Sequence, residues 1–262
     1  MTTRILIGAM ECGEGEIEDS KEAAFSQRDV YGEIDWELSR FVVRDIPECE
    51  AHRRIYSEFK TSKNAYNYLL KVDGDMVLRP GALARMVRAL KRQGGDCLLA
   101  RVRDYFTRAD IWGIWLYSQR CDWHWDRFLP RHGQPDKHLK DGLSYTKMEN
   151  AVADHCYKAT PLQAFRYGYN RVMRREHQQS HMRALVDHFA LTRTPRLRYA
   201  CLGALTACRK HPEPTHGNLE GLGTDYGDGL EETFQGALSE WSRVTDSYLA
   251  RQLSHALFEV MP

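Results

Sequence analysis

The sequence predicts an α/β protein in which a mostly parallel sheet, sandwiched by helices, is followed by a C-terminal helical extension. Short apolar segments alternate with helix-like segments in the first half of the chain, and helical patterns fill the second half. Strands alternating with helices in this way are typical of a parallel sheet covered on both faces. A chain of 262 residues with 42% hydrophobic residues can build a substantial core. We expect a core over residues 1–160 and a helical extension over residues 161–262.

Five segments of the first half have the length and apolar character of strands. The first, RILIGAM, ends in the polar loop ECGEGE, and the second, WELSRFVV, is closed by Pro47. The third, YLLKV, is apolar except for Lys71 and is typical of a buried strand. The predicted strands are Arg4–Met10, Trp36–Val43, Tyr68–Val72, Cys97–Arg103 and Ile111–Tyr117.

Three helices are expected between these strands. Ile17–Gln27 and Glu50–Leu69 carry apolar residues at helical spacing, and the end of the second runs into the third strand. Pro80–Gln93 begins with proline and stops at Gly94-Gly95, a normal C-terminal signal. Ligands of such sheets bind at the carboxyl ends of strands, where ECGEGE and the segment after the third strand both lie.

The second half of the chain changes character. Residues 118–150 show no convincing periodicity and are rich in Trp, His, Asp and Arg, which is typical of a functional or disordered loop. Thr160-Pro161-Leu162-Gln163 is a capping-box pattern with proline at the first helical position, so a helix is expected to begin there. Further helices are predicted over Met182–Leu191, Leu197–Cys208 and Leu230–Phe258.

Charge and cysteine content narrow the class of protein. The 37 Lys and Arg against 36 Asp and Glu leave a net charge of +1, which argues against a dedicated nucleic-acid binder. Seven cysteines occur without a C-x-x-C pair, so neither a disulfide framework nor a zinc ribbon is indicated. The N-terminal apolar stretch is too short for a signal peptide. We expect a cytoplasmic protein, with peripheral contact at the inner face of the membrane as the alternative.

Two aspartates, Asp73 and Asp75, follow the third predicted strand and precede the helix that begins at Pro80. Side chains at i and i+2 of an extended chain point to the same side, so these carboxylates can converge on a cation. Oxygen ligands favour Mg²⁺ or Mn²⁺, which bind through carboxylates and substrate phosphates. The alternative is an acidic turn that only caps the next helix.

Four segments resemble a GT-A fold glycosyltransferase of the family 2-like bacterial type that builds surface polysaccharides. They are IGAMECGEGEIEDSKEAAFSQ, RFVVRDIPECEAHRRIYSEF, LLKVDGDMVLRPGAL and ADHCYKATPLQAFRYGYNRVMR. Together they cover most of residues 4–175, and the DGD segment is the most specific of them. The resemblance implies a GT-A, Rossmann-like core that moves a sugar from a nucleotide-sugar donor to an acceptor hydroxyl.

The resemblance also implies a set of metal ligands. In that family an Asp-x-Asp holds Mn²⁺ or Mg²⁺ on the diphosphate of the donor. For this chain it implies Asp73 and Asp75 as the acidic ligands, with Asp73 also near the nucleotide ribose. His155 in ADHCY matches a histidine ligand that follows the core in such enzymes. Without the resemblance, a lone histidine of this kind is a surface or core residue.

The partners implied by the resemblance are a UDP- or GDP-sugar as donor and a glycan or lipid-linked glycan as acceptor. The loop after the first strand is expected to hold the nucleotide, which brings in Ala9, Met10 and Glu11. The alternative for Glu11 is a solvated loop acid. The product would be a surface polysaccharide or an O-antigen-type glycan.

An inverting transferase of this type needs a general base, normally a carboxylate. The usual glutamate–aspartate pair of the family is not legible in this chain. Asp126 and Asp141 lie in the expected interval, between the DGD segment and His155. Each is also typical of a solvated loop acid, and Glu149 or Asp154 could serve equally. Inversion is the expectation, and this departure leaves retention open.

Three other functions are compatible with the pattern. A sugar-phosphate nucleotidyltransferase also uses acids and a metal, but no glycine-rich, basic triphosphate loop follows the first strand. An enzyme that glycosylates DNA bases is disfavoured by the near-neutral charge. The third alternative is a non-catalytic glycan-binding or assembly subunit with a relict DGD segment.

Overall fold

The structure is a computed structural model that describes residues 2–11, 17–29, 32, 34–44, 46, 48–62, 65–125, 139–173, 179–211 and 229–260. The chain divides into two compact units. The first unit comprises Met1–Asp104 and Asp110–Tyr157, and the second comprises Tyr105–Ala109 and Lys158–Pro262.

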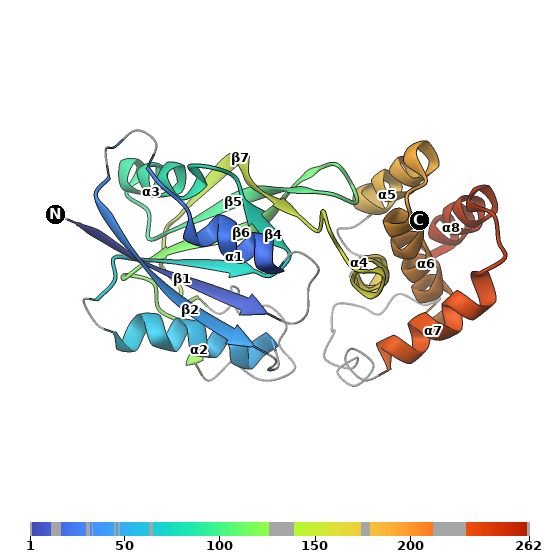
Figure 1. The fold of residues 1–262 in the computed structure, drawn as a ribbon, viewed down its shortest axis with the longest axis horizontal. Coiled ribbons are helices and arrows are strands. Elements are labelled where there is room, and N and C mark those ends of the chain that lie inside the picture. The colour runs from blue at the N-terminus through green and yellow to red at the C-terminus, as the bar shows by residue number, and fades with distance from the viewer. Residues whose placement is uncertain are drawn as a thin grey trace. The chain divides into compact units, whose positions relative to one another are not determined.

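The first unit is a seven-stranded sheet of order β2-β1-β3-β6-β5-β7-β4 (Figure 1). Five of these strands, β1, β2, β3, β5 and β7, run in one direction, and β6 and β4 run against them. The strands are β1 Thr3–Glu11, β2 Trp36–Arg44, β3 Tyr68–Asp73, β4 Met76–Leu78, β5 Cys97–Asp104, β6 Asp110–Ser118 and β7 Tyr145–His155. The predicted α/β class with a mostly parallel sheet is confirmed.

Helices cover both faces of this sheet, because β1 is apolar on both sides. Ile5 and Ile7 pack with residues of α1 (Ile17–Phe25) and α3 (Ala82–Gln93) in one buried cluster. Leu6 and Met10 point to the other face, where they pack with α2 (Glu48–Thr61). This alternation follows the period of two of an extended strand and places a core on each face.

The structure corrects the sequence-based interpretation of the segment before His155. Residues 118–150 were predicted to lack regular structure, but β7 begins at Tyr145 and lies between β5 and β4 within the sheet. Its exposed and buried residues do not alternate cleanly, because polar side chains line much of its first half. The short strand β4 was not predicted either. It pairs antiparallel with the end of β7, from Met76 opposite His155 to Leu78 opposite Ala153.

The second unit is helical, and its helices are α4 Pro161–Met173, α5 Gln179–Thr192, α6 Pro195–Lys210, α7 Leu230–Trp241 and α8 Asp246–Val260. The predicted capping box forms at the start of α4. Thr160 N–H donates to Gln163 Oε1 and Gln163 N–H donates to Thr160 Oγ1, both at 3.2 Å. The single helix predicted over Leu230–Phe258 is divided into α7 and α8 by a break after Trp241.

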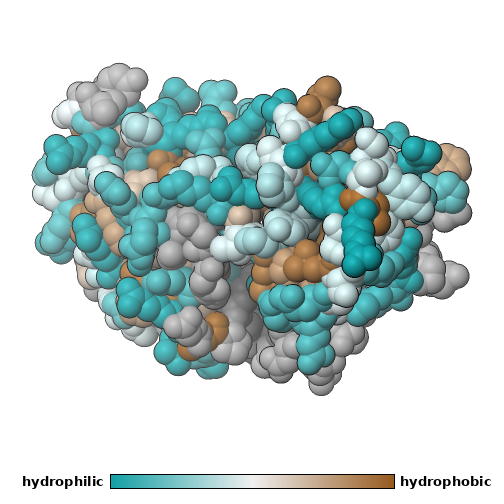
Figure 2. Space-filling view, turned by 45° about the vertical axis from the view of Figure 1, so that its right-hand side comes forward, coloured by the Kyte–Doolittle hydropathy of each residue, from teal (hydrophilic) through white to brown (hydrophobic). Residues whose placement is uncertain are grey.

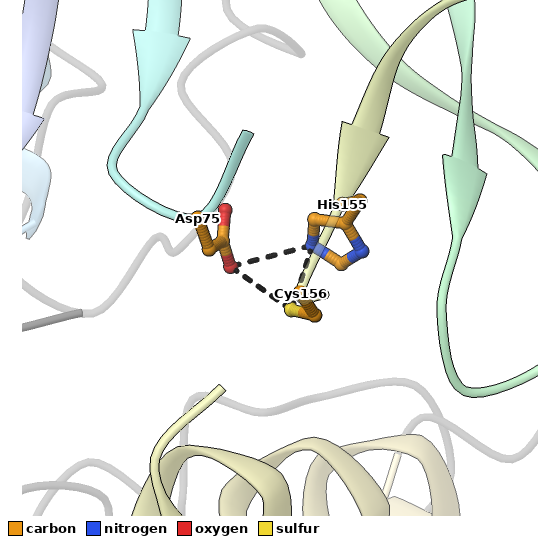
Figure 3. A group of neighbouring side chains, drawn as sticks. All are labelled: Asp75, His155 and Cys156. Carbon is orange, nitrogen blue, oxygen red and sulfur yellow. Dashed lines mark hydrogen bonds and ion pairs between the residues drawn. The ribbon is translucent and has the colours of Figure 1, made fainter. Parts of the chain in front are cut away.

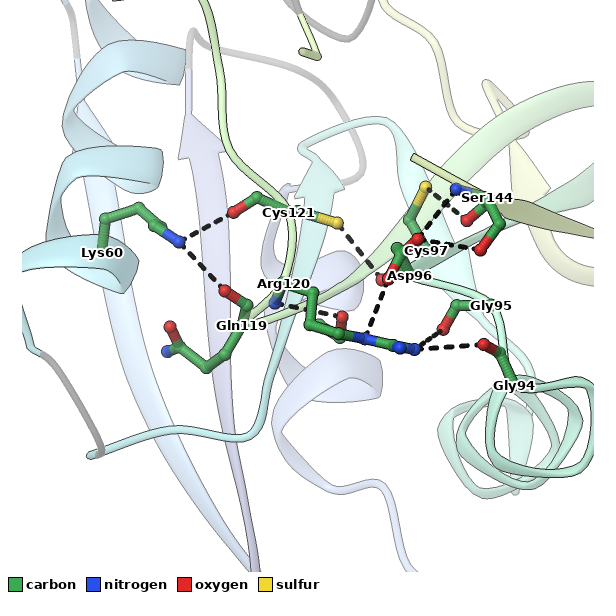
Figure 4. Close-up of polar contacts among 10 residues, drawn as sticks. Lys60, Gly94, Gly95, Asp96, Cys97, Gln119, Arg120, Cys121 and Ser144 are labelled. Carbon is green, nitrogen blue, oxygen red and sulfur yellow. Dashed lines mark hydrogen bonds and ion pairs between the residues drawn. The ribbon is translucent and has the colours of Figure 1, made fainter. Parts of the chain in front are cut away.

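A network of polar contacts surrounds Asp96, just before β5 (Figure 4). Its carboxylate accepts hydrogen bonds from the backbone N–H and the hydroxyl of Ser144, both at 2.8 Å, and pairs with Arg120 Nε at 2.8 Å. The guanidinium of Arg120 also donates to the carbonyl oxygens of Gly94 and Gly95. The network ties the end of α3 to the starts of β5 and β7, at the edge of the sheet opposite the carboxyl ends of the strands.

On the face drawn in Figure 2, hydrophilic residues dominate and hydrophobic residues gather in small groups. The large hydrophobic side chains that are exposed in the described part of the chain are Tyr145, Leu191, Tyr248 and Phe258. Among the helices that the structure describes, none has the length and apolar character needed to cross a membrane.

Candidate metal centre

Acidic and imidazole side chains gather where four strands of the sheet end. β1, β3, β5 and β7 run in the same direction, and their last residues are Glu11, Asp73, Asp104 and His155. Met10 lies opposite Asp73 in the pairing of β1 with β3, and Asp104 lies opposite His155 in the pairing of β5 with β7. The carboxyl edge of a sheet is the usual place for a ligand in an α/β fold.

A tight turn brings Asp75 to the end of β7. Gly74 and Asp75 form the turn between β3 and β4, and β4 then pairs antiparallel with β7. The backbone N–H of Cys156 donates to the carbonyl oxygen of Asp75 at 2.9 Å, which fixes the two chain segments together. The position of Asp75 beside His155 therefore depends on strand pairing over a distance of about 80 residues in the sequence.

Asp75, His155 and Cys156 form a compact group of possible metal ligands (Figure 3). Asp75 Oδ2 lies 3.3 Å from His155 Nε2, and Cys156 Sγ lies 3.4 Å from each of these atoms. Consecutive side chains of an extended strand point to opposite sides. Cys156 is an exception, because its φ of 58° lies in the left-handed region of backbone conformation. This conformation turns its thiol toward His155.

His155 is oriented by a buried carboxylate behind it. Its Nδ1 lies 2.9 Å from Asp104 Oδ1, and the Asp104 side chain is fully buried. A proton on Nδ1 would donate to Asp104 and leave Nε2 directed at Asp75 and Cys156. Burial lowers the pKa of His155, but Cys156 and the carboxylates of Asp75 and Asp104 outweigh it and raise the pKa well above its usual value. The two carboxylates therefore favour the positively charged form of this imidazole.

The two predicted acidic ligands differ in their electrostatic surroundings. Burial raises the pKa of Asp75, but the neighbouring His155 and the Cys156 thiol outweigh burial, so its pKa lies below the usual value. Burial raises the pKa of Asp73, and the charge of Lys71 opposes this effect only in part. Asp75 is therefore the better anionic ligand of the two.

Lys71 is a residue of this site that sequence reasoning missed. It lies two positions before Asp73 on the same face of β3, and its Nζ is 2.8 Å from Asp73 Oδ1. Its side chain is only 7% exposed. A buried lysine in an otherwise apolar strand was the signal that could have identified it, because such a cation is rarely buried without an acidic partner.

The residues around Asp75 fit a bound cation. Asp75 Oδ1 is buried and has no hydrogen-bond partner among the described residues, which is costly for a carboxylate oxygen. A carboxylate, an imidazole nitrogen and a thiol are all donors that divalent metals accept. Burial raises the pKa of the Cys156 thiol well above its usual value.

The predicted nucleotide-binding residues lie at the same edge. Ala9 and Met10 have buried side chains in β1, so only their backbone atoms are available to a ligand. Glu11 Oε2 is 2.8 Å from Arg44 Nε and 3.4 Å from Lys21 Nζ. Its carboxylate is therefore already neutralised by two basic side chains. Of the loop that follows β1, residues 12–16 lie outside the described residues.

Of the two predicted general bases, only Asp141 lies in the described part of the chain, and the fold does not bring it to this group. Asp126 lies outside the described residues. Asp141 is exposed in a turn that precedes β7, whereas His155 is the last residue of that eleven-residue strand. A strand of this length spans about 35 Å. Of the alternatives, Asp154 accepts from Arg79 Nη2 at 2.6 Å, and Glu149 pairs with Arg101 Nε at 2.7 Å.

Comparison of the sequence with protein-family models and with curated proteins gives no match. Among solved structures, S. aureus TarS in complex with UDP covers 94% of this chain and 92% of that chain, at 10% identity and a TM-score of 0.37. The complex of S. aureus TarS with UDP-GlcNAc covers 99% and 92%, at 10% identity and a TM-score of 0.36. A197 from STIV covers 59% and 85%, at 14% identity and a TM-score of 0.36. A likeness this distant does not assign a function.

Proposed function

We propose that this protein is a metal-dependent glycosyltransferase that moves a sugar from a nucleotide-sugar to an acceptor hydroxyl. The observation that carries the proposal is the convergence of Asp75 with His155 at the carboxyl edge of the sheet, with Asp73 beside the end of β1. This arrangement agrees with the resemblance of the sequence to GT-A glycosyltransferases. In that reading, residues 1–160 form the catalytic core, and 161–262 form the helical extension.

The residues of the site have separate roles in this proposal. Asp75 and His155 would hold a divalent metal, and Asp104 would orient the imidazole through its Nδ1. When bound, the metal would act as a Lewis acid on the diphosphate leaving group. Asp73 lies opposite Met10 and would contact the nucleotide, with Lys71 holding its carboxylate in place. A fixed set of charges of this kind stabilises charge that develops on the leaving group.

The remaining partners are proposed on the resemblance alone. The donor would be a UDP- or GDP-sugar, and the acceptor a glycan or lipid-linked glycan of a surface polysaccharide. Asp126 remains the predicted general base, since the distance along β7 argues against Asp141. We propose a cytoplasmic location for this reaction.

The test is thermal unfolding of the full chain with a panel of nucleotides. The panel contains UDP, GDP, UDP-GlcNAc and a GDP-hexose, each with and without Mn²⁺, Mg²⁺ or Zn²⁺. A ligand at a hundredfold excess over its Kd stabilises the folded state by about 2.7 kcal/mol. We expect one nucleotide class to raise the melting temperature only when a divalent metal is present.

Two variants separate the site from the rest of the surface. Asp75→Asn should abolish the metal-dependent rise, whereas Asp141→Asn, an exposed acid before β7, should retain it. Incubation of the best donor with metal should then release the nucleoside diphosphate slowly by hydrolysis. If no nucleotide shifts the melting of a well-folded sample, the transferase proposal is wrong and the non-catalytic alternative is favoured.

A further inference from the structure

We infer that Cys156 is a third protein ligand of this metal centre, and that the centre prefers Zn²⁺-like ions to Mg²⁺ or Mn²⁺. The inference uses the site of the proposed function and departs from the metals that the sequence resemblance implies. It concerns which ion binds and through which atoms, and it can be tested without a sugar donor or an acceptor.

The distances between the three donor atoms favour four-coordinate geometry. With zinc bonds of about 2.0–2.1 Å to oxygen or nitrogen and about 2.3 Å to sulfur, a tetrahedral site places its ligand atoms about 3.3–3.6 Å apart. The three separations in this chain are 3.3 Å for Asp75 Oδ2 to His155 Nε2 and 3.4 Å for Cys156 Sγ to each of them. An octahedral Mg²⁺ site with bonds of about 2.0–2.1 Å would bring neighbouring oxygen ligands to about 2.9 Å. The observed triangle is closer to the tetrahedral case.

The chemistry of the donors leads to the same ion class. Carboxylate and water ligands suit Mg²⁺ and Mn²⁺, imidazole suits Zn²⁺ and related ions, and thiolate selects the softer metals. Two of the three donors here, His155 Nε2 and Cys156 Sγ, therefore favour Zn²⁺. Three protein ligands with a fourth position left open is the usual plan of a catalytic zinc site. That open position is where an oxygen of a diphosphate could bind.

The surroundings of the group support ligation by Cys156. The Asp104 carboxylate behind His155 Nδ1 repeats the carboxylate–histidine arrangement that orients imidazole ligands of zinc. Cys156 adopts a left-handed backbone conformation that is strained for a residue with a side chain. Glycine would adopt this conformation without strain. The side chain of Cys156 is therefore present despite an unfavourable backbone conformation.

The experiment uses Co²⁺ as a spectroscopic substitute for Zn²⁺ in the full chain. Titration of the reduced protein with Co²⁺ should produce a sulfur-to-cobalt charge-transfer band in the near ultraviolet and intense visible bands of a four-coordinate ion. One equivalent of Zn²⁺ should remove both sets of bands, and a thousandfold excess of Mg²⁺ should not. These spectra report the ligands directly and do not depend on enzymatic activity.

Two variants of Cys156 and one control make the assignment specific. Cys156→Ser and Cys156→Gly should both lose the charge-transfer band. Both variants should also bind Co²⁺ more than tenfold more weakly. Removal of a residue that only contacts a metal ligand typically lowers metal affinity by about 10–100-fold, so a direct ligand should cost at least as much. The glycine variant suits the left-handed backbone, so it should fold at least as well as the parent. Cys208→Ser, which changes a buried cysteine of α6, should keep the bands.

The outcomes distinguish this inference from the proposed function. A charge-transfer band that persists in Cys156→Gly, Co²⁺ bound without such a band, or no Co²⁺ bound would each overturn the inference. If the nucleotide panel still gives a Mn²⁺-dependent rise in melting temperature in any of those cases, the transferase proposal is retained and the assignment of Cys156 as a ligand is abandoned. If Cys156 ligates Co²⁺ and no nucleotide binds, the metal centre stands and the transferase proposal fails.

Discussion

At the scale of single residues, buried and partly buried charges of opposite sign lie together at the carboxyl edge of the sheet. The ammonium of Lys71 pairs with the carboxylate of Asp73. The imidazole of His155 lies between the carboxylates of Asp75 and Asp104. The raised pKa of His155 favours a positive charge on its imidazole when no metal is bound. A metal bound to His155 Nε2 would displace the proton from that nitrogen. The charge of the metal would then replace the charge of the imidazolium. The site is thus built to hold positive charge in either state.

Asp96 at the opposite edge offers a test of how much a buried carboxylate contributes to stability. The hydrogen bond from the Ser144 backbone N–H is the main reason that its pKa is lowered, with Arg120 adding to the effect. We expect Asp96→Asn to reduce the free energy of unfolding by about 1–3 kcal/mol at pH 7, since hydrogen bonds to the charged group are lost. The measurement is urea unfolding over a range of pH.

The sign of the pH dependence follows from the lowered pKa. The stabilisation is fully present above the unfolded pKa of about 3.9 and is lost as the pH falls through the folded value. The difference between the parent and Asp96→Asn should therefore shrink below about pH 4. Asp141→Asn, an exposed acid of the same unit, should change stability little at any pH. A difference for Asp96→Asn that is independent of pH would contradict this account.

At the scale of elements, two glycines allow α4 and α6 of the second unit to pack closely. A Cβ added at Gly168 of α4 would lie 1.8 Å from the carbonyl oxygen of Ala200 in α6. A Cβ added at Gly203 of α6 would lie 2.0 Å from the carbonyl oxygen of Phe165 in α4. The atoms that a new side chain would meet are backbone atoms, so neither contact can be relieved by a side-chain rotation.

We expect Gly168→Ala to destabilise the second unit even though alanine favours helices. Alanine in a helix gains about 0.8–1.0 kcal/mol over glycine. Forcing an extra methyl group into a packed contact usually costs about 1–3 kcal/mol, and a clash with backbone lies at the upper end. The net effect should be a loss of free energy of unfolding, measured by urea denaturation.

Gly236→Ala in α7 is the matched control, because outside its own helix no atom of the described residues lies within 4 Å of the Cβ that it would add. Because alanine favours the helical conformation more than glycine does, this variant should raise the free energy of unfolding by about 0.5–1 kcal/mol. A stabilising effect of Gly168→Ala would mean that α4 and α6 can separate without cost.

The elements also show what the sequence could predict and what it could not. Strands such as β1 and β3, which are apolar on both faces, were identified because their composition alone marks them. β7 was missed because its first half is polar and because its place in the sheet depends on pairing with β5 and β4. Asp75 entered the prediction through the pair of aspartates that follows a predicted strand, whereas His155 entered through the resemblance of its segment, since no local pattern links the two residues.

Cys156 could not be identified in the same way. Its neighbour His155 suggested a ligand, but the side chain after a strand residue normally points away from it. The left-handed conformation of Cys156 reverses that direction, and it forms where the chain leaves the β4–β7 pairing. Such a conformation in a non-glycine residue has no reliable sequence signal, whereas Lys71 was visible as the one charged residue of the predicted strand Tyr68–Val72.

At the scale of the whole molecule, the chain consists of two units, each with its own core. Buried residues of the sheet and of α1, α2 and α3 form the clusters of the first unit. In the second unit the rings of Phe165 and Phe234 lie 5.2 Å apart between α4 and α7. Asp75, His155 and Cys156 all belong to the first unit. A metal bound by them should stabilise the unit that contains all its ligands.

Hydrogen exchange can test this division directly. An ion at a hundredfold excess over its Kd lowers the population of any state that cannot bind it by about 100-fold. We expect Zn²⁺ to slow exchange by up to that factor in β3, β4 and β7, whose opening breaks the site, and to leave α4 to α8 unchanged. In Asp75→Asn, the same Zn²⁺ concentration should slow exchange in neither unit. Equal slowing in both units of the parent would mean that they open as one cooperative body, because local opening of separate cores would not transmit the stabilisation.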